Sequence, residues 1–210
     1  MSTSTSLANL DNSVSPRPYH HGSLREALLE QAELTVRERG VQDLSLRELA
    51  RDIGVSHGAP RRHFADRQAL LDALAEAGFE RLGAELRAAL DAAGDDFRAR
   101  LHAAATAYVH FAVQDAALLE LMFAGKHQKE DWPHHEVADR AFSVIFELIL
   151  QGQAERVLEP GDPERVGLVL FATIQGIASL VSSGIVTPEQ LDELLTDAVE
   201  HFLRGSRAAV

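Results

Sequence analysis

SLRELARDIGVSHGAPRRHF, residues 45–64, predicts two short helices joined by a tight turn. Ser45 and Glu48 have the spacing of a capping box, in which each side chain binds an unpaired backbone N–H at the start of a helix. Apolar residues then recur on one face of two helical turns, at Leu46, Leu49, Ala50 and Ile53. Gly54 ends this helix because glycine readily adopts the left-handed conformation that reverses the chain, and Val55 follows as an apolar anchor. The stretch therefore predicts a helix-turn-helix.

The second helix is predicted from Ser56 to Phe64, and its composition indicates a binding role. Gly58 and Pro60 lower its intrinsic helicity, so it is a poor scaffold element. Small residues near its start let the backbone approach another surface, and arginine offers a fork of donors suited to a phosphate or a guanine edge. We expect this helix to enter the major groove of double-stranded DNA. The residues predicted at the DNA are Ser45, Ser56, His57, Gly58, Ala59, Arg61, Arg62, His63 and Arg67.

The expected DNA contacts divide by role. His57, Arg61 and Arg62 are predicted to reach bases or phosphates. His63 and Arg67 are predicted to contact the DNA backbone. Ser45, with the adjoining helix N-terminus, is predicted to bind a phosphate.

The span from about Ser23 to Leu74 resembles the DNA-binding domain of the TetR family of bacterial transcriptional regulators. Residues at the positions of that pattern are Gly40, Ala50, Gly54, Val55, Phe64 and Leu70. Arg61 stands where the family usually has a tyrosine, and Arg67 stands where it usually has a lysine; both positions commonly contact the DNA backbone. The tyrosine contact is not carried over, although arginine can bind phosphate in its place. The resemblance implies a homodimeric, ligand-responsive repressor.

Composition favours an all-α fold. The chain of 210 residues is 46% hydrophobic, which is enough for a sizeable core, and only 6% aromatic. It is rich in Ala, Leu, Glu and Arg, which favour helices. We predict nine helices and no strands. The absence of cysteine excludes a thiol redox switch, a zinc finger and a disulfide framework.

Charge separates the N-terminal part of the chain from the rest. The net charge is -12, yet residues 17–67 hold nine arginines and eight acidic residues. Residues 68–210 hold eleven basic and twenty-three acidic residues. A near-neutral head on an acidic body limits non-specific DNA affinity, because that affinity comes mainly from phosphate neutralisation. We predict a DNA-binding domain at 17–67 and a ligand-binding and dimerisation domain at 68–210.

Residues 1–16 are rich in Ser, Thr and Asn and lack the basic start and apolar run of a signal peptide, so they are predicted to form a disordered tail. The next polar residues are Arg17, Tyr19, His20 and His21. They suit an arm that reaches a phosphate or a minor groove. Equally, Tyr19 suits a staple that packs on the first helix.

Capping signals predict where the helices begin and end. Ser23 with Glu26 forms a second capping box, which starts a helix that ends at Gly40. Asp66 is predicted to cap a long helix that runs to about Leu90. Further helices are predicted over 97–114 and 115–124, from about Glu136, after Asp162 with Pro163, and after Thr187 with Pro188.

Residues 166–187 contain no charged side chain over twenty-two positions, a length that can span a bilayer. Thr, Gln and Ser residues make the run too polar for that use, and we predict no membrane contact. Small residues form one ridge, at Ala172, Gly176, Ser179 and Ser183, and large residues form another, at Leu170, Ile174, Ile177 and Val181. The two ridges predict a two-fold four-helix interface with the last helix, at Leu191, Leu195 and Phe202; a purely internal core helix is the alternative.

Aromatic side chains concentrate in the middle helices, where most of them suit an ordinary core. The resemblance implies that this region encloses an inducer pocket, and an aromatic wall with few polar groups suits a mostly apolar small molecule. The residues predicted at this effector are Phe79, Leu82, Tyr108, Phe111, Met122, Phe123, His127, Trp132, Phe142, Phe146 and Gln175. The effector is expected to shift the helix after Asp66 and so change the spacing of the two heads.

Other chemistry lacks a matching motif. The ten histidines include His127, His134 and His135, but no HExxH or HxH pairing is present, so we predict no metal and no cofactor. No nucleophile elbow, phosphate-cradling glycine loop or catalytic carboxylate pair is present either, which predicts that the protein is not an enzyme. We expect a cytoplasmic repressor of a pseudo-palindromic operator. A helical adaptor or a regulator that needs a co-repressor is the alternative, and activation stays open.

Overall fold

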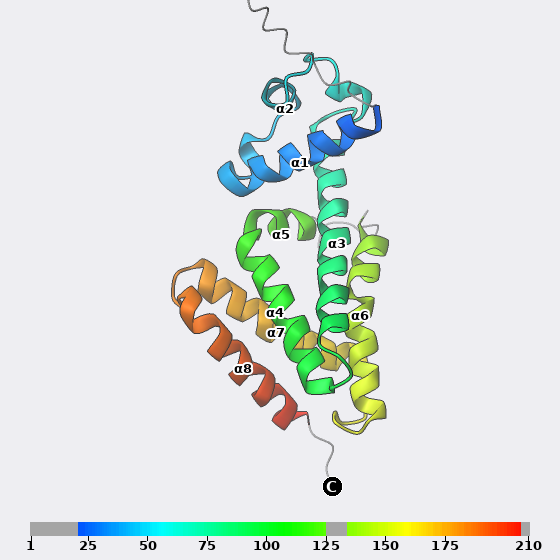
Figure 1. Ribbon diagram of the computed structural model, residues 1–210, viewed down its shortest axis with the longest axis vertical. Helices are drawn as coiled ribbons and strands as arrows, with labels where there is room; N and C mark the ends of the chain where they lie inside the picture. The colour runs from blue at the N-terminus through cyan, green and yellow to red at the C-terminus, as the bar shows by residue number, and fades with distance from the viewer. Residues whose placement is uncertain (1–20, 125–133, 207–210) are drawn as a thin grey trace, which may run out of the picture.

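One long helix, α3 (Arg67–Ala92), connects the two parts of the molecule in the computed structural model (Figure 1). The head lies at its N-terminal end and the body lies along the rest of its length. The structure describes residues 21–124 and 134–206. The other elements are α1 (His21–Arg39), the 3₁₀ helix η1 (Val41–Asp43), α2 (Leu46–Asp52), the 3₁₀ helix η2 (Pro60–Arg62), α4 (Phe97–Gln114), α5 (Ala116–Phe123), α6 (His135–Ala154), α7 (Pro163–Ser182) and α8 (Pro188–Gly205).

These elements confirm the all-α fold. Within the two described ranges there are eight α-helices and two 3₁₀ helices, and no strand. The predicted total of nine helices is therefore corrected. The difference arises after α2, where a full helix was expected and only the single 3₁₀ turn of η2 forms.

The ends of α3 agree with the capping signals. The Asp66 carboxylate accepts a hydrogen bond from the N–H of Ala69 at 2.9 Å, as predicted for an N-cap. The helix ends at Ala92, two residues past the expected Leu90. Its buried face runs from the head into the body and comprises Leu70, Leu74, Phe79, Leu82, Leu86 and Leu90, among others. One continuous helix therefore belongs to both cores.

The first helix starts earlier than the sequence indicated. α1 begins at His21, so Ser23 lies inside the helix and the predicted helix start at Ser23 is corrected. Neither His21 nor Gly22 forbids helical backbone dihedrals, and the capping pattern alone did not set the boundary. The predicted end is confirmed, because Gly40 leaves the helix with φ +83°.

Two caps in the body stand where they were expected, at Asp162 and Thr187, and a third, at Asp96, was not predicted. Asp96 starts α4 by accepting the N–H of Ala99 at 2.8 Å, and Asp162 starts α7 by accepting the N–H of Glu164 at 3.0 Å. The N–H of Thr187 donates to Gln190 Oε1 at 3.1 Å at the start of α8. Pro163 and Pro188 occupy the first helical positions, where the missing N–H costs nothing.

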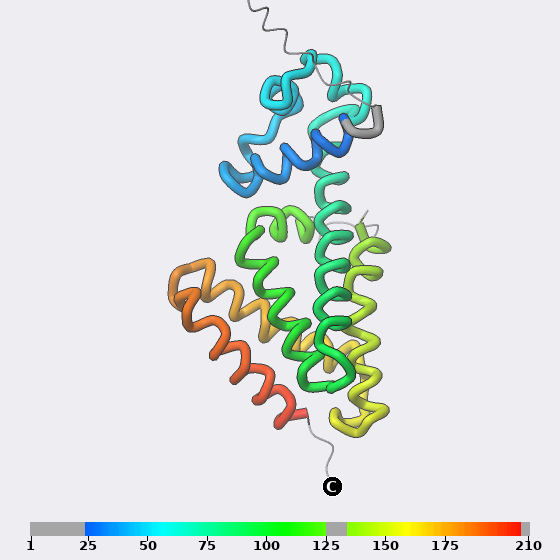
Figure 2. The backbone as a smooth tube through the Cα atoms, in the orientation of Figure 1, coloured from blue at the N-terminus to red at the C-terminus, as the bar shows by residue number. Residues whose placement is uncertain are grey.

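A glycine lets α3 and α6 approach closely. The two helices run side by side through the body (Figure 2). A Cβ built on Gly83 would lie 3.0 Å from the Cα and 3.4 Å from the Cβ of Ala141. Backbone atoms limit this contact, so a larger residue would push the helices apart.

We expect Gly83→Leu to lower the free energy of unfolding by about 1–3 kcal/mol, because overpacking against the α6 backbone outweighs a helix-propensity gain of about 1 kcal/mol. Urea denaturation followed by circular dichroism measures the effect. Ala84→Leu is the matched control: Ala84 is exposed on the same helix, and its change should stay within about 0.5 kcal/mol. Equal denaturation midpoints for the two variants would contradict the close approach.

Candidate functional site

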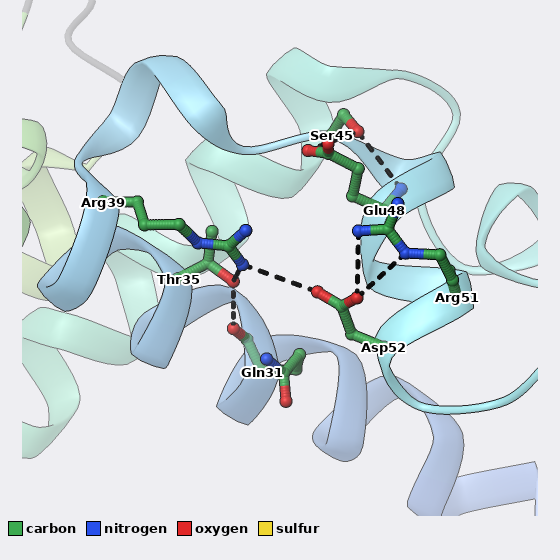
Figure 3. Close-up of polar contacts among 7 residues, drawn as sticks. All are labelled: Gln31, Thr35, Arg39, Ser45, Glu48, Arg51 and Asp52. Carbon is green, nitrogen blue, oxygen red and sulfur yellow. Dashed lines mark hydrogen bonds and ion pairs between the residues drawn. The ribbon is translucent and has the colours of Figure 1, made fainter.

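The start of α2 is fixed by one half of the predicted capping box. Ser45 Oγ accepts the backbone N–H of Glu48 at 3.2 Å, as expected. The Glu48 carboxylate instead accepts the Ser45 hydroxyl, at 3.3 Å between Oε2 and Oγ, so the reciprocal backbone bond is corrected. Ser45 is half-buried at the N-terminus of α2, beside Glu48 (Figure 3).

Charged side chains hold α2 against the end of α1. Asp52 lies between Arg39 of α1, at 3.5 Å, and Arg51 of α2, at 3.3 Å (Figure 3). Arg39 also donates to the hydroxyl of Thr35 at 3.4 Å, and Thr35 donates to the carbonyl oxygen of Gln31 at 2.8 Å. These exposed contacts connect α2 with the C-terminal part of α1.

The segment after α2 is turned rather than regularly helical. Between Ser56 and Phe64 the only helical element is η2, so the predicted recognition helix is corrected to two successive turns. The N–H of Ala59 donates to the carbonyl of Ser56 at 2.9 Å, and that of Phe64 donates to the carbonyl of Pro60 at 2.9 Å. Gly58 and Pro60 explain the difference, because they make a segment this short unable to sustain an α-helix by itself.

This segment presents free cations to solvent. Arg61 and Arg62 are exposed, and neither forms an ion pair with any residue in the described ranges. Ser56, His57 and Gly58 are exposed beside them, while Ala59 and His63 are half-buried. A Cβ on Gly58 would meet no atom within 4 Å, so a surface could approach its backbone closely. The predicted DNA-contacting residues of the segment thus lie on one short stretch.

Arg67 has a structural role that the sequence did not reveal. From the first position of α3 it donates to the carbonyl of Leu44 at 3.0 Å and to that of Val41 at 2.6 Å. It thereby ties the start of α3 to the linker between α1 and α2. Its other donors remain for the predicted contact with a DNA backbone.

A buried carboxylate links the head to the body. Asp115, at the junction of α4 and α5, is 2% exposed and accepts hydrogen bonds from Arg37 Nε of α1 and Arg81 Nη2 of α3, each at 2.7 Å. Glu33 of α1 lies 3.2 Å from Arg37 and 3.3 Å from Arg81. Burial raises the pKa of the Glu85 carboxyl at the edge of this cluster, and Arg81 opposes the rise. Three elements are therefore joined through two arginines.

We expect Asp115→Ala to lower the free energy of unfolding by roughly 1–3 kcal/mol, because Arg37 and Arg81 lose the carboxylate that compensates them. Urea denaturation at fixed protein concentration is the measurement. Asp95→Ala removes an exposed carboxylate from the turn after α3 and should leave stability nearly unchanged. A loss no larger than that of the control would show that the cluster does not fasten the head.

An apolar cavity of about 300 Å³ lies in the body. Its walls come from α3, α4, α6 and α7, with Phe123 from the end of α5. The lining residues are Leu86, Ala104, Ala105, Tyr108, Phe123, Phe142, Ile145, Phe146, Pro163, Glu164, Gly167, Leu168, Leu170, Phe171 and Ile174. Only Tyr108 and Glu164 among them have a side chain that forms hydrogen bonds.

Aromatic rings form much of the cavity wall. The Phe171 ring centroid lies 5.4 Å from that of Tyr108, 5.7 Å from that of Phe142 and 6.3 Å from that of Phe123. The Tyr108 hydroxyl donates to Gln175 Oε1 at 2.5 Å. Burial raises the pKa of Tyr108 well above its usual value, so the hydroxyl stays protonated at neutral pH. The wall is therefore uncharged on the side that α4 forms.

The predicted effector residues divide into three groups. Tyr108, Phe123, Phe142 and Phe146 line the cavity, and Gln175 reaches it only through the Tyr108 hydroxyl. Phe79, Leu82, Phe111 and Met122 are fully buried in the core instead, so their expected place in the wall is corrected. Periodicity identifies a buried face but does not say whether protein or empty space lies opposite. His127 and Trp132 fall outside the described residues.

Several residues that line the cavity were not predicted from the sequence. Phe171 belonged to neither ridge of the uncharged run, yet Gly167, Phe171 and Ile174 have the i, i+4, i+7 spacing of one helix face. That third stripe was the available signal. Ala104 and Ala105 gave no comparable signal, because small residues in a helix suit a close contact as well as a cavity.

The outward face of α7 matches the predicted small ridge. Ala172, Gly176, Ser179 and Ser183 are exposed, whereas the large ridge of Leu170, Ile174, Ile177 and Val181 is buried. Leu168, Val169 and Leu180 extend the exposed face and are 64%, 57% and 38% exposed. By length and composition alone, α7 is also the one helix of the described ranges that could cross a membrane.

The expected contribution of α8 to a dimer interface is corrected in part. Leu191, Leu195 and Phe202 are buried at 5%, 0% and 7% exposure. The apolar stripe of α8 packs against α4 and α7 of the same chain, and these side chains are not available to a partner. Exposed polar residues such as Asp192 and Thr196 occupy the opposite face.

The histidines near α6 lie beside carboxylates. His135 Nδ1 lies 2.8 Å from Asp139, and the buried His134 lies 3.7 Å from Asp72 on α3. Across residues 21–124 and 134–206, no group of three or more His, Asp or Glu side chains is arranged to hold a metal ion.

Family comparisons match both parts of this architecture. The family model described as bacterial regulatory proteins, tetR family, matches residues 28–74, and the model described as tetracyclin repressor-like, C-terminal domain, matches residues 101–202. The chain belongs to the TetR family. Its helix-turn-helix head is thus that of a DNA-binding transcriptional regulator, and TetR regulators are generally not enzymes. No curated protein matches the chain.

Solved structures agree with this TetR fold. A protein of unknown function from Rhodococcus sp. RHA1 is 46% identical, with a TM-score of 0.83, over 91% of this chain and 100% of that one. A bacterial regulatory protein in the tetR family from Rhodococcus RHA1 is 21% identical, with a TM-score of 0.65, over 91% and 100% of the two chains. The TetR family transcriptional regulator PfmR from Thermus thermophilus is 19% identical, with a TM-score of 0.65, over 84% and 97%. The last two similarities concern the fold alone.

Proposed function

We propose that this TetR protein is a transcriptional repressor that releases a pseudo-palindromic operator when a small, mostly apolar molecule occupies the body cavity. One observation carries the proposal: a single helix touches both sites. At its first position, Arg67 of α3 binds the linker of the head, and further along Leu86 of α3 lines the cavity. A ligand that favours another position of α3 would therefore change the placement of the head.

The proposal assigns DNA binding to residues 17–67 and effector binding with dimerisation to residues 68–210. Arg61 and Arg62 suit phosphates or a guanine edge because they are exposed and unpaired within the described chain. Two heads related by a two-fold axis would read two half-sites about one or more helical turns apart. The protein would act in the cytoplasm, where bacterial operators are found.

Selection of genomic DNA fragments by the purified protein at physiological salt tests this function. We expect enrichment of one palindromic sequence, which then serves as the operator in later assays. Flat enrichment without ligand would instead support the adaptor or the co-repressor-dependent regulator. Enrichment that is lost on addition of extracted small molecules would support a repressor.

We expect Arg61→Ala to weaken binding to that operator by about 1–3 kcal/mol if the guanidinium reads a base, because one bidentate contact is lost. Fluorescence anisotropy with labelled operator, at matched salt, is the measurement. Arg140→Ala is the control: it removes an exposed arginine from α6 and keeps the net charge equal to that of the first variant. Equal affinities of the two variants would remove Arg61 from the DNA interface.

The exposed ridge of α7 is the proposed dimer interface. Gly176 leaves open space around a built Cβ, so a side chain there disturbs no contact within the protomer. Leu168, Val169 and Leu180 lie on the same face and would lose their exposure against a second α7.

We expect Gly176→Asp to yield a folded monomer, because an unpaired carboxylate would be buried between two copies of α7. Light scattering coupled to size-exclusion chromatography measures the mass. Gly161→Asp adds the same charge in the loop before α7, where a Cβ also meets no atom, and should remain a dimer. A Gly176→Asp protein that stays dimeric would place the interface elsewhere.

A further inference from the structure

The size and chemistry of the cavity restrict what can occupy it. An apolar cavity of about 150 Å³ accommodates one benzene ring. The cavity here, at about 300 Å³, has roughly twice that space. Tyr108, Phe123, Phe142, Phe146 and Phe171 supply its rings, which favour edge-to-face contacts with another aromatic system.

Charge restricts the occupant further. Among the described residues that line the cavity none is a cation, and the one acidic residue there, Glu164, is exposed at the start of α7. A carboxylate inside the cavity would therefore lose its water without gaining a positive partner. Its approach would also be opposed by Glu164.

The occupant does not need to form a hydrogen bond with the cavity wall. The Tyr108 hydroxyl donates its one proton to Gln175, at 2.5 Å, so it is already satisfied without a ligand. A hydrocarbon can fill the space beside it and leave no buried donor unpaired.

We propose that the cavity binds a neutral aromatic molecule of about two fused rings. The binding class rests on the cavity alone, whereas its role as the effector rests on the function proposed above. The exposed lining residues Phe146 and Glu164 mark the side on which the cavity meets solvent and through which such a molecule enters.

Naphthalene, 2-naphthoate and toluene are the probes, titrated separately into the full-length protein at neutral pH by isothermal calorimetry. We expect naphthalene to bind most tightly. The anion should bind at least about tenfold more weakly because its carboxylate is desolvated, and toluene at least about tenfold more weakly because it buries fewer carbons. Binding of 2-naphthoate equal to or tighter than that of naphthalene would overturn the neutral class, and absence of naphthalene binding would overturn the proposal.

The variant Gly167→Leu tests whether naphthalene binds in the cavity. Gly167 lines the cavity within α7, and a Cβ there would meet one atom only, Ile149 Cγ1 at 4.0 Å. The leucine should enter the empty space without strain and weaken naphthalene binding at least about tenfold, since it fills part of the volume that the ligand needs. Ala154→Leu, at the exposed end of α6, is the matched control and should leave the affinity unchanged. Naphthalene binding that is insensitive to Gly167→Leu would show that it binds elsewhere.

Phe171→Leu tests the aromatic preference. This variant keeps the wall apolar but removes the ring that contacts Tyr108, Phe142 and Phe123, so naphthalene should bind several-fold more weakly. An unchanged affinity would overturn the aromatic part of the proposal.

Operator binding, measured with and without naphthalene, tests the ligand class and the repressor function separately. If naphthalene binds as expected and causes the protein to release the operator, the ligand class and the repressor function are both supported. If it binds in the cavity and leaves operator affinity unchanged, the ligand class stands and the effector role falls. If the operator is selected but none of the three probes binds, the ligand class falls and DNA recognition stands.

Discussion

The pairing of Asp115 with two arginines is the contact on which the arrangement of head and body depends. A carboxylate removed from water is stable only when it is paired and hydrogen-bonded. Arg37 and Arg81 satisfy one oxygen each, and they come from α1 and α3. Because the loss of either arginine would leave the buried carboxylate with one partner fewer, the cluster favours one relative position of α1, α3 and the α4–α5 junction. The orientation of the DNA-binding surface is thus set from the body.

α3 provides the second link between the sites. Arg67 and Leu86 are separated by about 28 Å along a helix that rises 1.5 Å per residue. A rigid helix of this length converts a small tilt at the cavity into a displacement at the head. A ligand can drive that displacement only by binding one position of α3 more tightly than another. The ion cluster sets the energy against which such a difference must act.

Local signals predicted the helices well, since a cap or a stop acts within a few residues. Asp66 and Asp162 each cap the helix that was predicted to start after them. The site was harder to predict because its parts meet across the sequence: Asp115 is 78 residues from Arg37 and 34 from Arg81. The buried Phe79 and the half-buried Phe142 have the same local sequence pattern, yet only Phe142 borders empty space. The helix predicted over residues 56–64 does not form as a regular α-helix, because the glycine and the proline in this short segment disfavour helical structure.

The two faces of α7 relate the cavity to the proposed dimer. Leu170 and Ile174 line the cavity on the inner face, while Ala172 and Gly176 are exposed on the outer one. A helix packed on both faces cannot relax toward a ligand without disturbing its partner, since packed interfaces resist continuous deformation. If α7 is held in a dimer, the wall it forms is rigid. The adjustment to a bound ring system then falls on α3 and α6, and α3 is the helix that carries the head.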